Sequence, residues 1–193
     1  MLVESIWGTR MAFVIVDPQR KFTLDVPDWN ARASSAVDSI NRFAREFRDR
    51  GLPVIFIHFD GESHCRYDGT DGDEWLEGIE TSDSDTIVHK EHMNCFKQTD
   101  LEKVLRDAGA DCVLFGGMLT EYCVISTYFA ASEREFTPYL AKDALIPYNE
   151  DGNEAAQLIC GTVPLEVLVR FISGQQPPMT MVERSHPEYE GAR

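Results

Sequence analysis

Short apolar runs alternate along the chain with longer runs in which apolar residues recur every three or four positions. Met11 to Val16 is continuously hydrophobic and stops at Asp17, which is typical of a parallel strand buried on both faces. Residues 31–50 have the helical spacing, and Gly51 follows them. The same patterns predict further strands and helices at Pro53–Phe59, Thr86–His89 and Asp111–Phe115 (strands), Thr99–Ala108 and from Thr120 (helices), and Phe136–Ala141 (strand).

Strands that alternate with helices, without Asn-Gly hairpin signals, indicate βαβ units with right-handed crossovers. We therefore predict a three-layer αβα protein whose parallel sheet is covered by helices on both faces. The 193 residues fit one domain, which we expect to span residues 1–173. Residues 174–193 are polar and rich in proline, and we expect them to form a C-terminal arm outside the core.

The segment Asp60–Ser84 has no sustained periodicity and is longer than ordinary structureless connections. It holds nine acidic residues and one basic residue, so about −8 of the chain's formal charge of −15 lies here. A connection of this length is typical of a functional lid or a disordered loop, and an acidic run is also typical of a solvated surface.

Composition limits the classes of partner. A formal charge of −15 and a pI near 4.6 disfavour nucleic acid, and the longest apolar runs are too short to span a membrane. The opening residues MLVESIWGTR lack a signal-peptide pattern, so we expect a cytoplasmic protein that acts on a small molecule. The five cysteines have no CxxC spacing, which argues against a disulfide framework or a zinc knuckle.

Candidate chemistry gathers where the predicted strands end. In an open parallel sheet, ligands bind beyond the carboxyl ends of the strands. Asp17 follows the first strand, Lys90 follows another, and Cys123 follows the strand DCVLF near the start of a helix. Each residue also has a structural interpretation: the aspartate in a turn, the lysine as a solvated charge, and the cysteine in packing.

Together these three residues suit acyl transfer. Thr120 resembles a helix cap, so Cys123 would lie in the first turn, where free N–H groups and the helix dipole lower a thiol pKa. The same N–H groups would form an oxyanion hole. Asp17 would be the general base, and Lys90 would balance the charge of both partners.

Several segments resemble the isochorismatase-like cysteine hydrolases. They are AFVIVDPQRKF (12–22), GTDGDEW (69–75), VHKEHMNCFKQTDLEKVL (88–105), GGMLTEYCVISTYFAA (116–131) and YLAKDA (139–144). The most specific pieces are D-x-Q-x-x-F from Asp17, the lysine followed by Phe96 and Thr99, and G-x-x-T-x-x-C-V from Gly117. The resemblance covers about residues 11–173.

The resemblance implies a Rossmann-like, six-stranded parallel sheet, whose last strand shrinks here to Thr162-Val163. It also implies that Asp17, Lys90 and Cys123 form the catalytic triad. A cis peptide would fall at Met118-Leu119 and turn the N–H groups of Leu119 and Cys123 toward the substrate oxygen. Similar proteins are commonly dimers or tetramers, so we expect a homo-oligomer. We expect the substrate to be bound by Gln19, Phe22, Phe59, Trp75, Met118 and Tyr122.

The metal pattern of the family is not reproduced. Nicotinamidases in this family bind a metal through Asp-x-His and a further histidine, whereas this chain has His58, Asp60 and then His64. The residue types suit zinc if the loop folds back. In the alternative, His58 is hydrogen-bonded at a strand end and His64 is exposed, and we predict no cofactor and no metal.

The main functional prediction is an amidohydrolase that cleaves a small amide, ureide or carbamoyl C–N bond through a thioester on Cys123. An alternative is isochorismatase-type hydrolysis of a vinyl ether, in which Asp17 is the acid and the cysteine has no role. A third is a relative without catalysis, such as a thiol sensor. Dinucleotide binding is disfavoured because the chain lacks a G-x-G-x-x-G arrangement after a strand.

Overall fold

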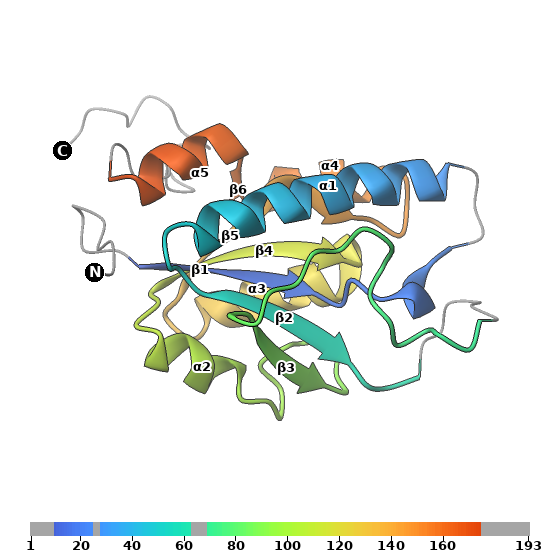
Figure 1. Ribbon diagram of the computed structural model, residues 1–193, viewed down its shortest axis with the longest axis horizontal. Coiled ribbons are helices and arrows are strands. Elements are labelled where there is room, and N and C mark those ends of the chain that lie inside the picture. Colours follow the sequence, from blue (N-terminus) through green and yellow to red (C-terminus); the bar gives the residue numbers. More distant parts are fainter. Residues whose placement is uncertain (1–9, 25–27, 63–68, 175–193) are drawn as a thin grey trace.

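A six-stranded parallel sheet forms the centre of the protein (Figure 1). The computed structural model describes residues 10–24, 28–62 and 69–174. The strands lie in the order β3-β2-β1-β4-β5-β6, and all neighbouring pairs are parallel. They span β1 Met11–Val16, β2 Val54–Phe59, β3 Thr86–Lys90, β4 Cys112–Met118, β5 Thr137–Ile146 and β6 Thr162–Val163. The order reverses between β1 and β4, which defines the switch point of a doubly wound sheet.

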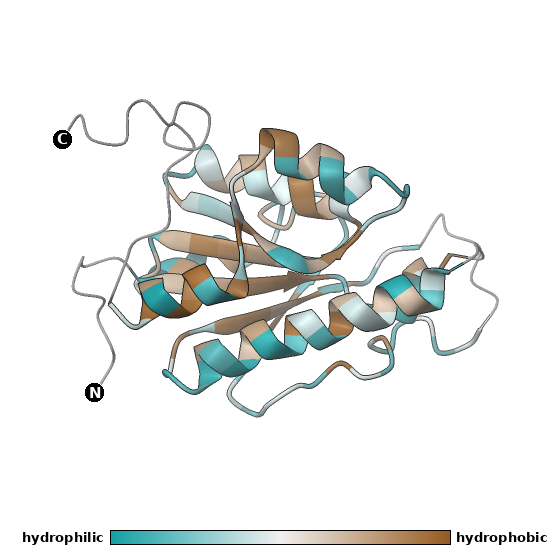
Figure 2. Cartoon of the chain, turned by 90° about the horizontal axis from the view of Figure 1, so that it is seen from above, coloured by the Kyte–Doolittle hydropathy of each residue, from teal (hydrophilic) through white to brown (hydrophobic). Residues whose placement is uncertain are grey.

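Helices cover both faces of this sheet, as the alternation of elements predicts. The helices are α1 Trp29–Arg48, α2 Leu101–Asp107, α3 Ile125–Ser132, α4 Gly152–Ile159 and α5 Leu165–Ile172. Residues of α1 and α5 share one buried cluster with Phe13 of β1, and residues of α2, α3 and α4 share another with Val14. Successive strand residues point to opposite faces, so β1 supplies both clusters. Figure 2 shows hydrophobic residues along the central strands and many hydrophilic residues on α1.

The structure confirms the predicted fold and extends two strands. β4 continues past Phe115 through two glycines to Met118, and β5 continues past Ala141 to Ile146. Glycines have no side chain, so they interrupt the apolar pattern from which the end of β4 was to be read. The sequence did not predict α4, which is short and leaves Leu158 83% exposed.

The acidic segment after β2 is anchored where the structure describes it. The Arg20 N–H bonds to the Glu74 carbonyl at 2.9 Å, and the Leu76 N–H bonds to the Pro18 carbonyl at 2.8 Å. The Asn41 side chain of α1 donates to the Gly78 carbonyl at 2.7 Å. These contacts fasten residues 69–84 along the short helix η1 (Arg20–Phe22) and α1. This part of the segment is therefore anchored to the fold, whereas its length and lack of periodicity suggested a lid or a disordered loop.

Basic side chains neutralise several of the acids in this segment. Ion pairs join Arg20 to Asp71 and Arg45 to Glu80, and Lys21 also pairs with an acid of the segment. The local charge is therefore partly balanced within the fold. None of the helices in the described part of the chain is long and apolar enough to cross a bilayer. The predicted arm over 174–193 lies outside the described residues except for its first residue.

Candidate active site

The switch point of the sheet brings together the three residues that the sequence singled out. Asp17 directly follows β1, Cys123 follows the adjacent strand β4, and Lys90 ends β3. Asp17 has a φ of 46°, a left-handed conformation that is uncommon for an aspartate and marks the abrupt end of the strand. Its N–H remains bonded to the Ile57 carbonyl of β2 at 3.2 Å, which fixes the residue at the sheet edge.

Asp17 and Lys90 form a fully buried ion pair. Lys90 Nζ lies 2.7 Å from Asp17 Oδ2, and both side chains are 0% exposed. Lys90 Nζ also donates to the His92 carbonyl oxygen at 3.0 Å and stands 5.0 Å from the centre of the Phe59 ring. The ammonium is therefore held by a carboxylate, a carbonyl oxygen and an aromatic face.

Burial controls the protonation of this pair. It raises the pKa of Asp17 from 3.8 to about 6, and Lys90 opposes that rise. Burial alone would lower the pKa of Lys90, but neighbouring thiols and the Asp17 carboxyl raise the pKa above its ordinary value. The pair therefore holds one carboxylate and one ammonium at neutral pH, and the carboxylate is a stronger base than an exposed aspartate.

Cys123 lies in a π-helical turn, Thr120–Val124, directly before α3. The Met118-Leu119 peptide bond ahead of it is cis, as the family resemblance implied. The N–H groups of Tyr122 and Val124 both donate to the Leu119 carbonyl oxygen, which holds the start of this turn together. The predicted cap at Thr120 is wrong, because Leu119 precedes the helix and no side chain caps it.

Two side chains fasten this turn to α4 and to the loop between β5 and α4. The Thr120 hydroxyl donates to Asn153 Oδ1 at 2.7 Å. The Glu121 carboxylate accepts the N–H groups of Tyr148 and Asn149, each at 2.7 Å. Sequence reasoning missed Glu121, because a carboxylate that binds main-chain N–H groups far along the chain has no local signature. These contacts tie the cysteine turn to a part of the chain about 30 residues further on.

The Cys123 thiol lies close enough to the Asp17 carboxylate for the two side chains to interact. Burial, together with the negative charge of Asp17, raises the pKa of the thiol above its ordinary value, and Lys90 opposes this effect. The expectation of a lowered pKa and a resting thiolate is therefore wrong. In the resting site a neutral thiol faces a carboxylate that can remove its proton.

A second thiol lies beside this group. Cys95 is completely buried, and burial raises its pKa to about 12. The N–H of Cys95 donates to the Thr127 hydroxyl at 3.1 Å, which in turn donates to the Cys123 carbonyl oxygen at 2.6 Å. A thiol with so high a pKa is unreactive at neutral pH, so we regard Cys95 as part of the packing around Cys123.

Gln19 was predicted to bind substrate, but its side-chain amide forms hydrogen bonds to main-chain atoms of the protein itself. Its Oε1 accepts the Phe59 N–H at 2.8 Å, and its Nε2 donates to the carbonyl oxygens of Phe59 and Asp73 at 3.2 and 3.3 Å. Gln19 is completely buried. It fixes the end of β2 and thereby the Phe59 ring, which packs on Phe22 with ring centres 5.6 Å apart.

The other predicted substrate-binding residues have different surroundings. Trp75 packs against Phe56 on the α1 face of the sheet, and its ring centre is 5.5 Å from that of Phe56. Met118 is completely buried, whereas Tyr122 is 41% exposed and meets Tyr148 edge to face. Phe59 faces the Lys90 ammonium and Phe22 packs on the Phe59 ring, so these two residues are the strongest candidates for the pocket wall.

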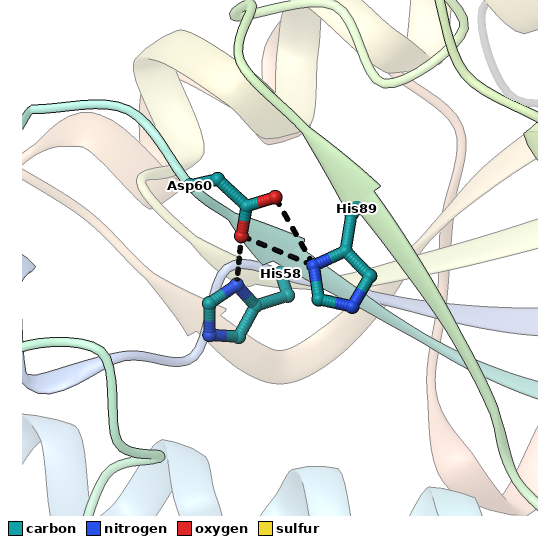
Figure 3. A group of neighbouring side chains, drawn as sticks. All are labelled: His58, Asp60 and His89. Atoms are coloured by element: carbon teal, nitrogen blue, oxygen red, sulfur yellow. Dashed lines mark hydrogen bonds and ion pairs between the residues drawn. The ribbon is translucent and has the colours of Figure 1, made fainter.

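The carboxyl ends of β2 and β3 hold a separate group of three ligand-type side chains, His58, Asp60 and His89 (Figure 3). Asp60 Oδ1 lies 2.6 Å from His58 Nδ1 and 3.0 Å from His89 Nδ1. Burial by itself raises the pKa of Asp60, but the hydrogen bonds and charges of His89 and His58 together outweigh it and lower that pKa below its ordinary value. The predicted third member, His64, lies outside the described residues.

Sequence reasoning missed His89, although the pairing of β2 with β3 places it directly beside His58. β2 and β3 pair so that His58 faces His89 and Phe59 faces Lys90. Once Lys90 is placed at the strand end, the preceding histidine must lie beside the histidine of β2. The missing information was that these two strands are neighbours, which a single sequence does not state.

Comparisons with known proteins agree with this geometry. A sequence model of the isochorismatase domain matches residues 11–158. The Bacillus subtilis isochorismatase family protein YrdC is 28% identical over 138 residues, which is 70% of this chain and 73% of that protein.

Two solved structures share the fold. The chain is similar to N-carbamoylsarcosine amidase from Thermoplasma acidophilum, with a TM-score of 0.67, 23% identity, and 81% and 95% of the two chains covered. It is also similar to the pyrazinamidase of Pyrococcus horikoshii, solved in complex with zinc, with a TM-score of 0.68, 25% identity, and 81% and 98% covered.

Proposed function

The chain belongs to the isochorismatase family of hydrolases, and on this premise we propose that it cleaves the C–N bond of a small amide, ureide or carbamoyl compound. One observation carries the proposal: Asp17 forms a buried ion pair with Lys90, and the Cys123 thiol lies beside that carboxylate. A nucleophile, its base and a group that orients the base form the arrangement that covalent catalysis needs. The names of the two amidases with this fold support the same reaction class.

In the first half-reaction the Cys123 sulfur bonds to the substrate carbonyl carbon, and the thiol proton passes to Asp17. The main-chain N–H groups of Leu119 and Cys123 hold the oxyanion that develops on the carbonyl oxygen. The C–N bond then breaks, and Asp17 gives the proton to the leaving nitrogen. Ammonia or an amine departs, and an acyl thioester remains on the cysteine.

In the second half-reaction Asp17 removes a proton from water, which attacks the thioester carbon. The C–S bond breaks, the carboxylic acid leaves, and the proton returns to sulfur. Lys90 keeps Asp17 ionised in its buried position, so that the carboxylate is available as a base at both steps.

A panel of small amides, ureides and carbamoyl compounds, assayed for ammonia, tests the proposal. We expect wild-type protein to release ammonia from at least one of them, and Cys123→Ala to lose at least about 1,000-fold in kcat. Cys112→Ala is the matched control, because Cys112 is a buried thiol at the opposite end of β4. Mass spectrometry of quenched wild-type reactions should show the acyl adduct on Cys123.

The same variants separate this reaction from hydrolysis of a vinyl ether. If the protein hydrolysed an enol ether with Asp17 as the acid, Cys123→Ala would keep full activity and only Asp17→Asn would lose it. Full turnover of an amide by Cys123→Ala would refute the thioester mechanism. If no member of the panel reacted, the C–N hydrolase proposal would fail, and the alternatives of vinyl-ether hydrolysis and of a relative without catalysis would take its place.

A further inference from the structure

We propose that Glu121 is a positioning residue for the cysteine: its carboxylate binds the loop between β5 and α4 and thereby holds the Thr120–Val124 turn, and Cys123 with it, in place. This role rests on the proposed function, in which Cys123 attacks the substrate. Glu121 Oε2 accepts the Tyr148 N–H at 2.7 Å, and Oε1 accepts the Asn149 N–H at 2.7 Å and the Asn149 side-chain amide at 3.2 Å. Hydrogen bonds to an ionised carboxylate are roughly twice as strong as neutral ones.

The place of Glu121 in the turn gives its contacts an influence on the reacting atoms. The turn is π-helical, a rare geometry that occurs mostly at functional sites, and no side chain caps its start. Glu121 stands two residues before Cys123, whose sulfur is the proposed nucleophile and whose N–H is a proposed oxyanion donor. A shift of the main chain at Glu121 would therefore move both groups. Misplacement of a reacting group by about 1 Å can cost about 100-fold in rate.

The first residue of α4, Gly152, leaves the room that the Glu121 carboxylate occupies. A Cβ on this buried glycine would lie 2.1 Å from Glu121 Oε1 and 2.9 Å from Pro147 Cβ. Alanine is ordinarily preferred to glycine within a helix, so the contact with Glu121 accounts for a residue that helix propensity disfavours. Replacing Gly152 by alanine would push the carboxylate out of its place without changing Glu121 itself.

A second link joins the same parts of the chain and does not depend on Glu121. The Thr120 hydroxyl donates to Asn153 Oδ1 at 2.7 Å, and Asn153 Nδ2 donates to the Leu145 carbonyl oxygen at 2.9 Å. Thr120 is completely buried. Because this link remains when Glu121 is replaced, we expect the variants to fold and the turn to loosen around Cys123.

Turnover of an amide substrate tests the role of the carboxylate. We expect Glu121→Ala to lose about 100-fold in kcat with KM nearly unchanged, because the substrate still binds and the sulfur is misplaced. Glu121→Gln keeps one oxygen acceptor and should stay within about 10-fold of wild type in kcat. Gly152→Ala should lose about as much as Glu121→Ala. Glu154→Ala is the matched control on an exposed carboxylate of α4, and it should keep the wild-type kcat.

Alkylation by iodoacetamide at a fixed pH reports on the thiol without a substrate. Burial, together with the charge of Asp17, raises the pKa of Cys123, which keeps it slow to react. We therefore expect Cys123 to react at least about 10-fold faster in Glu121→Ala and Gly152→Ala, although turnover falls. The other thiols that the structure describes are buried: Cys95, Cys112 and Cys160. They should stay unlabelled, whereas a general loss of stability would expose them as well.

The double variant tests whether the two residues act through one contact. Adding Gly152→Ala to Glu121→Ala should change the alkylation rate of Cys123 by less than about twofold, because both changes remove the same interaction. If the two effects multiplied instead, Gly152 would not act through the Glu121 carboxylate.

Two results would overturn the proposal: Glu121→Ala with the alkylation rate and kcat of wild type, or Glu121→Gln as impaired as Glu121→Ala. If Cys123→Ala abolished turnover while Glu121→Ala left it unchanged, the thioester mechanism would stand and the positioning role would fail. If the amide panel were inactive, the alkylation of Cys123 would still show whether Glu121 holds the turn.

Discussion

The same two strands carry both the Lys90 side of the active site and the His58–Asp60–His89 group, on opposite faces. Phe59 and Lys90 point to one face, and the residues that precede them point to the other. Asp17, on the first side, is completely buried and its pKa is raised to about 6. Asp60, on the second side, is 40% exposed and its pKa is lowered by two imidazoles.

The contrast shows that burial, more than residue type, decides what a carboxylate can do. A buried carboxylate that is paired with one ammonium has a pKa close to neutral and can act as a general base. A wet carboxylate between two imidazoles stays ionised, and water screens its contacts. The two carboxylates should therefore differ in how much their removal, or the removal of their partners, changes the free energy of unfolding.

Lys90→Met should give the largest effect, because it leaves the Asp17 charge buried without its cation. We expect the free energy of unfolding at pH 7 to fall by about 3–5 kcal/mol. Urea denaturation followed by circular dichroism measures this. Lys97→Met is the matched control on an exposed lysine, and it should change stability by less than about 0.5 kcal/mol. A loss of less than about 1 kcal/mol in Lys90→Met would show that water reaches the Asp17–Lys90 pair.

Gly117→Ala should give the next largest effect, because the end of β4 has no room for a side chain. A Cβ on Gly117 would lie 2.2 Å from the Val16 carbonyl oxygen, and the residue has a φ of +98°. We expect a loss of about 3 kcal/mol from the clash and the backbone strain combined.

Gly51→Ala separates these two causes. Gly51 also has a positive φ, of +63°, but a Cβ there would meet nothing within 4 Å. It should lose only the backbone term of about 1–2 kcal/mol. Equal losses in the two variants, measured in the same urea experiment, would mean that the close approach of β1 and β4 contributes nothing.

Much of the fold could be predicted from the sequence, because apolar runs and helical spacing report burial directly. The runs at β1 and β2 are nearly complete in the sequence. β4 was shortened because Gly116 and Gly117 carry no hydrophobic signal, although they pack closely against β1. The helix α4 was missed because its hydrophobic residues do not all face the core.

The site could be predicted in part for a related reason. Position at a strand end, with the family resemblance, singled out Asp17, Lys90 and Cys123 as candidates, and the structure pairs the first two. The direction of the Cys123 pKa was predicted wrongly, since a helix start lowers a thiol pKa but burial beside a carboxylate raises it. His89 was missed because strand neighbours, and hence cross-strand partners, are set by topology and not by local pattern.

The pH profile of amide hydrolysis should report the buried carboxylate. Asp17 must be ionised to act as a base, and its pKa is about 6, so kcat/KM should fall about tenfold per pH unit below that value. Above it the carboxylate is fully available. An exposed aspartate would instead show this acid limb near pH 4.

Two variants assign the limb. Asp17→Asn should lose most activity and leave no limb near pH 6 in what remains. Asp60→Asn should keep the limb in the same place, because this carboxylate lies on the other face. If the acid limb moved in Asp60→Asn and stayed in place in Asp17→Asn, Asp17 would not be the general base.

The smallest effect is expected from Asp60→Asn in chelator-treated protein, without any added metal. Water screens an exposed carboxylate, so its two imidazole contacts should contribute less than about 1 kcal/mol to the free energy of unfolding. Urea denaturation under the conditions used for Lys90→Met gives a direct comparison of the two faces. A loss of 3 kcal/mol or more would mean that the His58–Asp60–His89 group is as dry as the Asp17–Lys90 pair, and the contrast between a buried base and an exposed carboxylate would fail.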